Sequence, residues 1–251
     1  KTEQGTMKLG LQLYNFRNEL QADFRGALKK IATLGFDGVE FASYYGQIPP
    51  AELAELLQEL GLECAGTMFN VDEILDPDSQ VFEYAHALKS PAVTVSQSMD
   101  FVTNCELFCD TCRKLGDAAH ANGSIFSYHN HWAEFDLKDG VPVMDRMIEA
   151  TDPKKVFLEL DVCWITRAGL KPGEYILKHA PRVRQLHMKD IIVPDDPNTT
   201  TELGNGIVDL KAAFQAAKQT PCQWLIYEQD YCKGSPFDSA KISLEFLKKL
   251  A

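Results

Sequence analysis

The sequence has no long apolar run, no low-complexity linker and no excess of basic residues, and each absence excludes a class of protein. No apolar stretch reaches the roughly 18 residues that a membrane-spanning helix needs, so we expect no membrane partner. The 36 acidic side chains outnumber the 25 basic ones, and the net charge of −11 argues against a nucleic-acid partner. No Ser/Gly tract or charge block divides the chain. We therefore expect residues 1–251 to form a single domain, and a homo-oligomer is compatible with this composition.

The seven cysteines are odd in number and scattered, which favours buried free thiols over a disulfide framework. Cys105, Cys109 and Cys112 have the C-x3-C-x2-C spacing that holds an iron–sulfur cluster in radical SAM enzymes. Within an amphipathic helix, spacings of four and three put all three on one face, which favours core packing. The chain starts at Lys1 without Met. We expect a cytoplasmic protein by default, with export to the periplasm after removal of a signal as the alternative.

A strand followed by a helix recurs eight times along the chain, which predicts a (β/α)8 TIM barrel of the α/β class. Alternation or apolar runs predict the strands at 9–14, 38–42, 62–69, 92–96, 125–130, 156–162, 183–189 and 224–229. Helical spacing, with Pro at starts and Gly at stops, predicts helices at 24–34, 50–60, 79–89, 104–121, 142–150, 172–179, 209–219 and 237–250. A doubly wound open sheet is the alternative. It usually has a Gly-rich turn after its first strand, which residues 14–17 lack.

Polar side chains stand where several of the predicted strands end. The segment 183–190 turns from alternating apolar residues to His187, Lys189 and Asp190, and Asp161 and Glu228 end the strands before and after it. Parallel strands end on one side of a sheet, so we expect Asp161, His187 and Glu228 to meet there. Carboxylates with an imidazole suit Mn²⁺, Mg²⁺, Co²⁺ or Zn²⁺. The alternative is that they only cap helices and form ion pairs.

A fourth metal ligand is expected from the fifth strand. His129 stands at the strand's end and Glu134 in the segment just beyond it, and both remain candidates. His129 and His131 are two residues apart and share one side of the strand, which favours a functional role over a structural one.

A glycine-containing turn and two tryptophans are compatible either with ligand binding or with a purely structural role. The turn 204–206, Gly-Asn-Gly, precedes a helix with Asp209 as its N-cap; it either presents N–H groups to a ligand oxygen or only leads into the helix. Trp132 and Trp164 follow strand ends, where aromatic rings can pack on sugars, although core packing is an equal alternative for Trp164.

The strand endings together resemble one known family. They read Tyr-His-Asn-His at 128–131, Glu-Leu-Asp at 159–161, His-Met-Lys-Asp at 187–190 and Tyr-Glu-Gln-Asp at 227–230. This pattern resembles the xylose isomerase-like TIM-barrel family, in its sugar phosphate isomerase/epimerase and inosose dehydratase-like branch. Its endonuclease branch has a histidine ligand where this chain has Met68, so DNA repair is disfavoured.

The resemblance implies one divalent metal ion and a set of residues around it. His129 stands where the epimerases have a Glu, so Glu134 is predicted to reach back and supply the fourth ligand. His129 and Glu228 are then predicted as acid and base, and Lys189 as holding a substrate oxygen. The predicted site residues are these: catalytic His129, Glu228 and Lys189; metal-binding Glu134, Asp161, His187 and Glu228; substrate-binding Glu40, His131 and Trp132.

The resemblance also implies an activity on a small carbohydrate. We expect an isomerase or epimerase of a sugar or keto-sugar, which removes a proton next to a carbonyl group that the metal binds. The alternative enzyme is a lyase or dehydratase of an inosose or 3-keto-glycoside. A sugar-binding domain without turnover is the remaining alternative.

Overall fold

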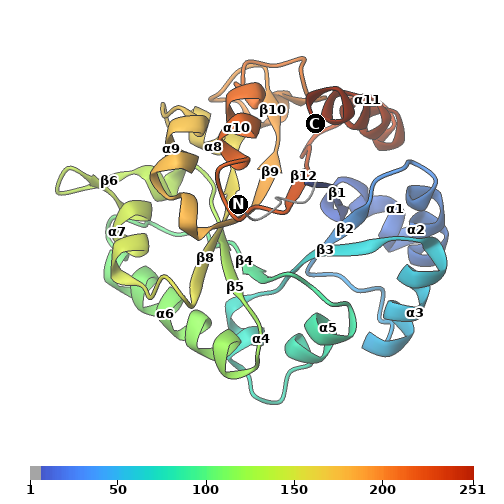
Figure 1. Cartoon of the computed structure of the whole chain (residues 1–251), viewed down its shortest axis with the longest axis horizontal. Coiled ribbons are helices and arrows are strands. Elements are labelled where there is room, and N and C mark those ends of the chain that lie inside the picture. The colour runs from blue at the N-terminus through green and yellow to red at the C-terminus, as the bar shows by residue number, and fades with distance from the viewer. Residues whose placement is uncertain (1–6) are drawn as a thin grey trace.

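The computed structural model describes residues 7–251, and its centre is a closed barrel of eight parallel strands (Figure 1). Around the barrel the order is β1-β12-β9-β8-β5-β4-β3-β2, so each strand lies beside its neighbours in sequence and the last closes on the first. The barrel strands are β1 Lys8–Gln12, β2 Gly38–Ala42, β3 Glu63–Met68, β4 Val93–Val95, β5 Phe126–His129, β8 Val156–Asp161, β9 Val183–Met188 and β12 Trp224–Tyr227. This confirms the predicted TIM barrel. The polar tail 1–6, which the export alternative invoked, lies outside the described residues.

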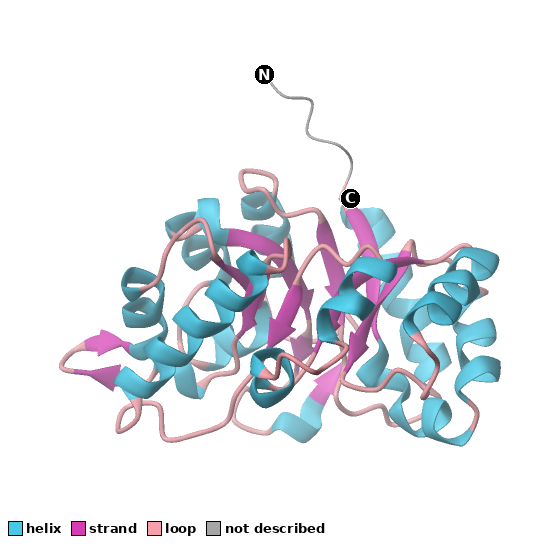
Figure 2. Cartoon of the chain, turned by 90° about the horizontal axis from the view of Figure 1, so that it is seen from below, coloured by secondary structure: helices cyan, strands magenta, loops and turns pink. Residues whose placement is uncertain are grey.

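Helices surround the barrel on all sides (Figures 1 and 2). The α-helices are α1 Arg17–Ala22, α2 Phe24–Ala32, α3 Pro50–Leu60, α4 Val71–Leu75, α5 Val81–Ala87, α6 Cys105–Ala121, α7 Val143–Ala150, α8 Val162–Arg167, α9 Pro172–Lys178, α10 Leu210–Ala217 and α11 Pro236–Leu250. The connecting segments also contain four short 3-10 helices: η1 Leu13–Phe16, η2 Ala133–Phe135, η3 Ala180–Arg182 and η4 Pro197–Thr199. No helix in the part of the chain from residue 7 onward is long and apolar enough to cross a bilayer.

Local sequence signals account for where many helices begin and end. The side chains of Asp23, Asp209 and Ser235 accept hydrogen bonds from the first turns of α2, α10 and α11, which satisfies N–H groups that have no partner inside the helix. Helix α3 starts with Pro50 and ends at Gly61, whose φ of 68° is a left-handed conformation that glycine adopts without strain.

The structure contains short elements that the sequence analysis did not predict. The helices α1, α4 and α8 have five or six residues each and lie in loops that follow barrel strands. The pair β6 Leu137–Lys138 and β7 Val141–Pro142 forms a small hairpin that projects from one side in Figure 1. A second antiparallel pair, β10 Asp190–Ile191 and β11 Thr200–Thr201, follows β9. The first strand ends two residues earlier than predicted, because residues 13–16 form η1.

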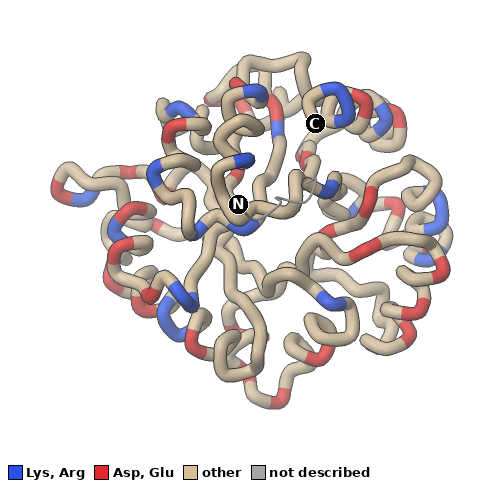
Figure 3. Tube along the Cα trace, viewed as in Figure 1, with Lys and Arg blue, Asp and Glu red and all other residues tan. Residues whose placement is uncertain are grey.

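Apolar side chains fill the space between the barrel and the helices, whereas part of the barrel interior is polar. Cys105, Cys109 and Cys112 are all buried on α6, which confirms that they face the core. Charged residues of both signs are spread over the outer helices (Figure 3). By contrast, Gln12, Glu40, Glu159, Gln185 and His187 are fully buried in the barrel. Burying polar groups is unfavourable unless partners satisfy them, and hydrogen bonds within the barrel do so for Gln12, Gln185 and His187.

Candidate metal centre and pocket

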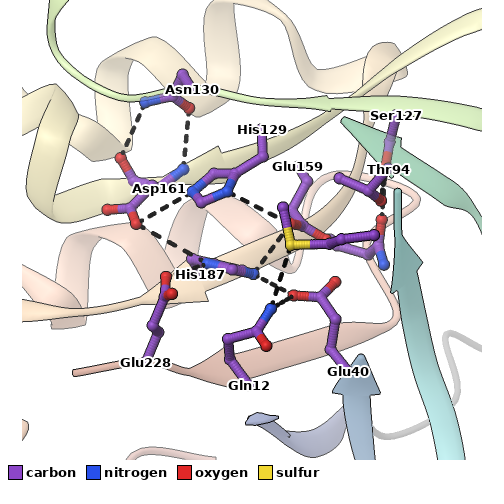
Figure 4. Close-up of polar contacts among 12 residues, drawn as sticks. Gln12, Glu40, Thr94, Ser127, His129, Asn130, Glu159, Asp161, His187 and Glu228 are labelled. Carbon is purple, nitrogen blue, oxygen red and sulfur yellow. Dashed lines mark hydrogen bonds and ion pairs between the residues drawn. The ribbon is translucent and has the colours of Figure 1, made fainter. Parts of the chain in front are cut away.

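Four side chains from neighbouring strands converge at the carboxyl ends of the barrel strands (Figure 4). One ligand atom from each of His129, Asp161, His187 and Glu228 can be chosen so that all four lie within 4.8 Å of one another, and all four residues are buried. Nε2 of His129 lies 3.4 Å from Oδ2 of Asp161, and Nδ1 of His187 lies 3.9 Å from the same oxygen and 2.8 Å from Oε2 of Glu228. Two imidazole nitrogens and two carboxylate oxygens form a donor set suited to a divalent transition metal.

Strand register brings these side chains together. Asp161 pairs with His187 across β8 and β9, and His129 pairs with Glu159 across β5 and β8. The register of β8 against β9 shifts between Leu158 and Glu159, a bulge-type irregularity of the kind common beside active sites.

Hydrogen bonds to the backbone N–H and to the side-chain Oδ1 of Asp161 fix its position. Oδ1 accepts hydrogen bonds from the N–H groups of Cys163 and Trp164, at 3.0 and 3.2 Å, and so caps helix α8. The side chain of Asn130 accepts from the N–H of Asp161 at 3.0 Å (Figure 4). These contacts fix the carboxylate and leave Oδ2 directed at the two histidines.

His187 is oriented by two buried carboxylates on the side away from Asp161. Its Nε2 lies 2.5 Å from Oε1 of Glu40 and 2.9 Å from Oε1 of Glu159, so a proton on Nε2 is shared with that pair and Nδ1 faces the candidate metal position. Gln12 donates to Oε1 of Glu40 at 2.6 Å. Glu40, Glu159 and His187 form a second group of possible metal ligands, with one ligand atom of each within 4.8 Å of the others. In this group Nε2 of His187, not Nδ1, lies beside the carboxylates.

Electrostatics differ sharply between the two carboxylates beside His187. Burial raises the pKa of Glu40 well above its usual range, and the charge of Glu159 adds to this. Burial also acts to raise the pKa of Glu159, but the charge of His187 and its hydrogen bond hold that pKa below the usual value. Burial disfavours the charged ring of His187, yet Glu159, Glu40 and Glu228 raise its pKa well above the usual value. A divalent ion bound at Nδ1 would therefore have to displace a proton from His187.

Lys189 is a buried cation among three carboxylates. Its side chain is 1% exposed, and Nζ lies 3.3 Å from Oδ2 of Asp161 and 3.0 Å from both Oε2 of Glu228 and Oδ2 of Asp230. Burial acts to lower the pKa of Lys189, but these carboxylates raise it well above its usual value, so the side chain stays charged. Although burial opposes it, the charges of Lys189 and His187 hold the pKa of Glu228 well below its usual range.

Glu134, predicted as the fourth ligand, has other partners in this structure. It is fully buried in η2, and its Oε1 accepts from the hydroxyl of Tyr128 at 2.8 Å and from the N–H of His131 at 3.0 Å. Burial raises its pKa. The structure does not bring Glu134 into the four-residue group, where His129 takes the fourth place.

A pocket of about 380 Å³ opens above this centre. It is lined by Gln12, Tyr14, Ala42, Ser43, Met68, Ser96, His129, His131, Glu228 and Asp230. The predicted substrate-binding residue His131 is therefore in the lining; burial lowers its pKa to about 3, so its ring is neutral. Glu40 is not in the lining, but it contacts the lining residue Gln12. Trp132 is not in the lining either: its ring lies 3.6 Å below the guanidinium of Arg167 and 5.0 Å from the ring of Trp164.

The turn 204–206 is occupied by a side chain of the protein itself. Oδ2 of Asp190 accepts from the N–H groups of Gly204 and Gly206, each at 3.0 Å, and Oδ1 accepts from Val208 at 3.1 Å. A Cβ on Gly206 would lie 2.2 Å from Oδ1 of Asp190, so only glycine permits this approach. The carboxylate thus fills the place that a ligand oxygen would take.

Sequence reasoning assigned no role to Glu159, Gln12 or Asp190. Glu159 could have been found, because it precedes Asp161 by two residues in a strand and so faces the same side. The partners of Gln12 and Asp190 lie far away in the chain, and no local pattern indicates them.

A family model described as xylose isomerase-like TIM barrel matches residues 28–250. The chain belongs to this family. Inosose dehydratase of Geobacillus thermodenitrificans is 22% identical over an alignment 298 residues long, gaps included, which covers 98% of this chain and 98% of that one.

Two solved structures share the fold. A sugar phosphate isomerase/epimerase from Parabacteroides distasonis has a TM-score of 0.79 at 19% identity, covering 99% of this chain and 96% of that one. A structure of IOLI protein with a bound zinc atom has a TM-score of 0.76 at 15% identity, covering 97% and 98%. The resemblance seen in the sequence is therefore confirmed, in a family that contains both dehydratases and epimerases.

Proposed function

We propose that this protein is a divalent-metal-dependent enzyme that removes a proton from the carbon next to the carbonyl group of a keto-sugar or inosose, and that the reaction ends in elimination of water. The observation that carries the proposal is the overlap of ligand group and pocket. Of the four candidate ligands, Glu228 and His129 also line the pocket, so they can meet both a metal and a substrate.

His129, Asp161, His187 and Glu228 are the residues assigned to the metal. A bound divalent ion would polarise the carbonyl and make the neighbouring C–H more acidic. The donor set fits such an ion, and Glu40 with Glu159 would hold His187 in the tautomer that offers Nδ1. The identity of the metal among Mn²⁺, Mg²⁺, Co²⁺ and Zn²⁺ is left to experiment.

Glu228 is the proposed base. A base must be ionised before it takes a proton, and the ammonium of Lys189, 3.0 Å from Oε2, favours the ionised form. Glu228 takes the proton from carbon, a C=C bond forms as the C–O bond on the next carbon breaks, and the hydroxyl leaves as water with that same proton. One carboxylate is sufficient for this sequence. Lys189 is not part of the pocket lining, so in place of the expected contact with a substrate oxygen we assign it a positioning role that keeps Glu228 ionised.

Epimerisation is the second candidate, because it needs a proton donor on the opposite face of the carbon and His129 also lines the pocket. His129 can act in this way only if its Nε2 does not bind the metal. Elimination is favoured because His129 stands in the ligand group, 3.4 Å from Asp161, and because the curated relative is a dehydratase.

The test is incubation of the metal-loaded protein in D₂O with a panel of ketoses, inososes and 3-keto-glycosides. We expect water loss, seen as absorbance of an unsaturated ketone, or exchange of deuterium into one class of compound. Glu228→Gln should lower this rate by about 10²–10⁴-fold or more and should also weaken metal binding, because Glu228 is assigned both to the proton and to the metal. Absence of exchange and of water loss across the panel would refute the proposal.

His129→Gln separates the two outcomes. If His129 binds the metal, the variant loses metal and activity together. If the variant keeps its metal and its deuterium exchange but no longer forms a diastereomer, epimerisation is the correct reading.

A further inference from the structure

We propose that the pocket takes an uncharged carbohydrate and discriminates against phosphorylated ones. This inference rests on the proposed function and narrows its substrate class. It comes from three observations. The pocket lining is acidic, the nearby cations lie outside the lining, and backbone N–H groups in the loops where barrels commonly hold a phosphate already donate to acceptors within the protein.

The lining of the pocket contains acidic groups and no Lys or Arg among the described residues. Glu228 lies at the metal end. Asp230 comes two residues later, and its side chain is 29% exposed, so its carboxylate meets whatever enters. A phosphate in the pocket would lie beside carboxylates, without the basic side chains that normally bind it.

None of the three cations closest to the pocket, Lys189, Arg17 and Arg167, is part of its lining. Lys189 is surrounded by the carboxylates of Asp161, Glu228 and Asp230, so its single charge is more than balanced. Arg17 donates to the carbonyl oxygens of Tyr14 and Asp230 at 2.9 and 3.0 Å, and its guanidinium packs on the ring of Tyr14. Arg167 packs on the ring of Trp132, and its Nη1 is buried without a hydrogen-bond partner, but the side chain lies outside the lining.

TIM barrels commonly hold phosphate with N–H groups of the loops after the seventh and eighth strands. In the loop after β9, the N–H groups of Gly204, Gly206 and Val208 donate to Asp190. In the loop after β12, the N–H of Gln229 donates to the side chain of Asn15 at 2.9 Å, and that of Tyr231 to the hydroxyl of Thr200 at 3.0 Å. These donors have internal acceptors and are not offered to a ligand.

A phosphate dianion that leaves water must find compensating charge or hydrogen bonds. Apart from the proposed divalent ion at its metal end, this pocket offers the phosphate carboxylates instead. The hydroxyl groups of a neutral sugar, in contrast, can donate to Glu228 and Asp230 and accept from the neutral ring of His131, all of which line the pocket.

The test compares neutral compounds with their own phosphate esters on the metal-loaded protein. The pairs are D-fructose with D-fructose 6-phosphate, D-xylulose with D-xylulose 5-phosphate, and myo-inositol with myo-inositol 1-phosphate. Binding is measured by calorimetry, and deuterium exchange is measured for the ketoses. We expect each bound neutral compound to bind at least tenfold more tightly than its ester. An ester that binds as tightly as its parent overturns the inference, as does a protein that binds none of the neutral compounds.

The two proposals fail in different ways. Binding of neutral compounds without exchange or water loss in any substrate refutes the proposed function and leaves the inference standing. Exchange that is faster with the phosphate esters supports the proposed function and overturns the inference.

A variant tests the electrostatic account. Asp230→Asn removes one negative charge from the lining. The preference for each neutral compound over its ester, measured as the ratio of the two affinities, should therefore fall by about tenfold. Asp139→Asn removes the same charge from the β6–β7 hairpin, where the side chain is 83% exposed and outside the lining, and should leave the ratio unchanged. Equal ratios in the two variants would overturn the role given to Asp230.

Discussion

Replacement of Lys189 by methionine should destabilise the metal-free protein strongly. The side chain is 1% exposed and its ammonium contacts Asp161, Glu228 and Asp230 at 3.0–3.3 Å. Methionine has a similar length and no charge, so Lys189→Met leaves a group of buried carboxylates without their cation. Removing one partner of a buried ion pair typically costs about 3–5 kcal/mol.

This loss should be visible in the melting temperature. In a domain of this size, 1 kcal/mol shifts Tm by about 2–4 °C, so Lys189→Met should lower Tm by about 6–20 °C in the presence of a chelator. A divalent ion bound by Asp161 and Glu228 replaces the missing positive charge. The deficit should therefore become smaller when the ion is saturating.

The assay is thermal unfolding followed by circular dichroism, with chelator and with each of Mn²⁺, Mg²⁺, Co²⁺ and Zn²⁺. Lys241→Met is the matched control, because Lys241 is exposed and its contact with Asp238 is 3.9 Å long; its effect should stay within about 0.5 kcal/mol. If the two variants melt alike in chelator, Lys189 is not balancing buried charge. If metal leaves the deficit of Lys189→Met unchanged, the ion is not bound beside it.

Three further predictions concern single features. Glu134→Gln should keep the metal content of the parent, as measured by mass spectrometry, whereas Asp161→Ala should lose it; loss from Glu134→Gln would make Glu134 a ligand after all. Burial acts to raise the pKa of Asp145, but hydrogen bonds from His179, Lys178 and Tyr175 hold it below the usual value. Asp145→Asn should thus cost about 1 kcal/mol at pH 7 after allowance for solvent screening, and urea unfolding should show this difference beginning to shrink as the pH falls below about 4 and vanishing only once the pH passes the lowered pKa. For the buried thiols of α6, reconstitution with iron and sulfide should leave the visible spectrum empty, and stoichiometric absorbance would contradict core packing.

The barrel and the meeting of the strand ends could be predicted from the sequence because both follow from short-range patterns. Each strand ends in polar residues, and parallel strands in a closed barrel end on one side. Asp161, His187 and Glu228 come together for that reason alone. The same logic placed His129 at the end of the fifth strand.

Two parts of the site depend on geometry that no local pattern fixes. Glu134 lies in a single 3-10 turn, and its carboxylate is directed by the hydroxyl of Tyr128 and the N–H of His131. The pair Glu40 and Glu159 comes from strands on opposite sides of the barrel order, β2 and β8, and only closure of the barrel brings both to His187.

The hydrogen-bond partner of the turn 204–206 could not be predicted either, because it is not adjacent to the turn in the sequence. Its N–H groups were free to bind a ligand as far as the sequence indicated. The carboxylate that occupies them belongs to Asp190, 14 residues before Gly204 and 16 before Gly206.

The central claim is that one divalent ion is bound by His129, Asp161, His187 and Glu228, and anomalous scattering from a crystal grown with Mn²⁺ or Zn²⁺ tests it most directly. We expect one peak, about 2.0–2.3 Å from Nε2 of His129, Nδ1 of His187 and the carboxylate oxygens of Asp161 and Glu228. A peak between Glu40 and Glu159, a peak bound by Glu134, or no peak at saturating metal would contradict the account.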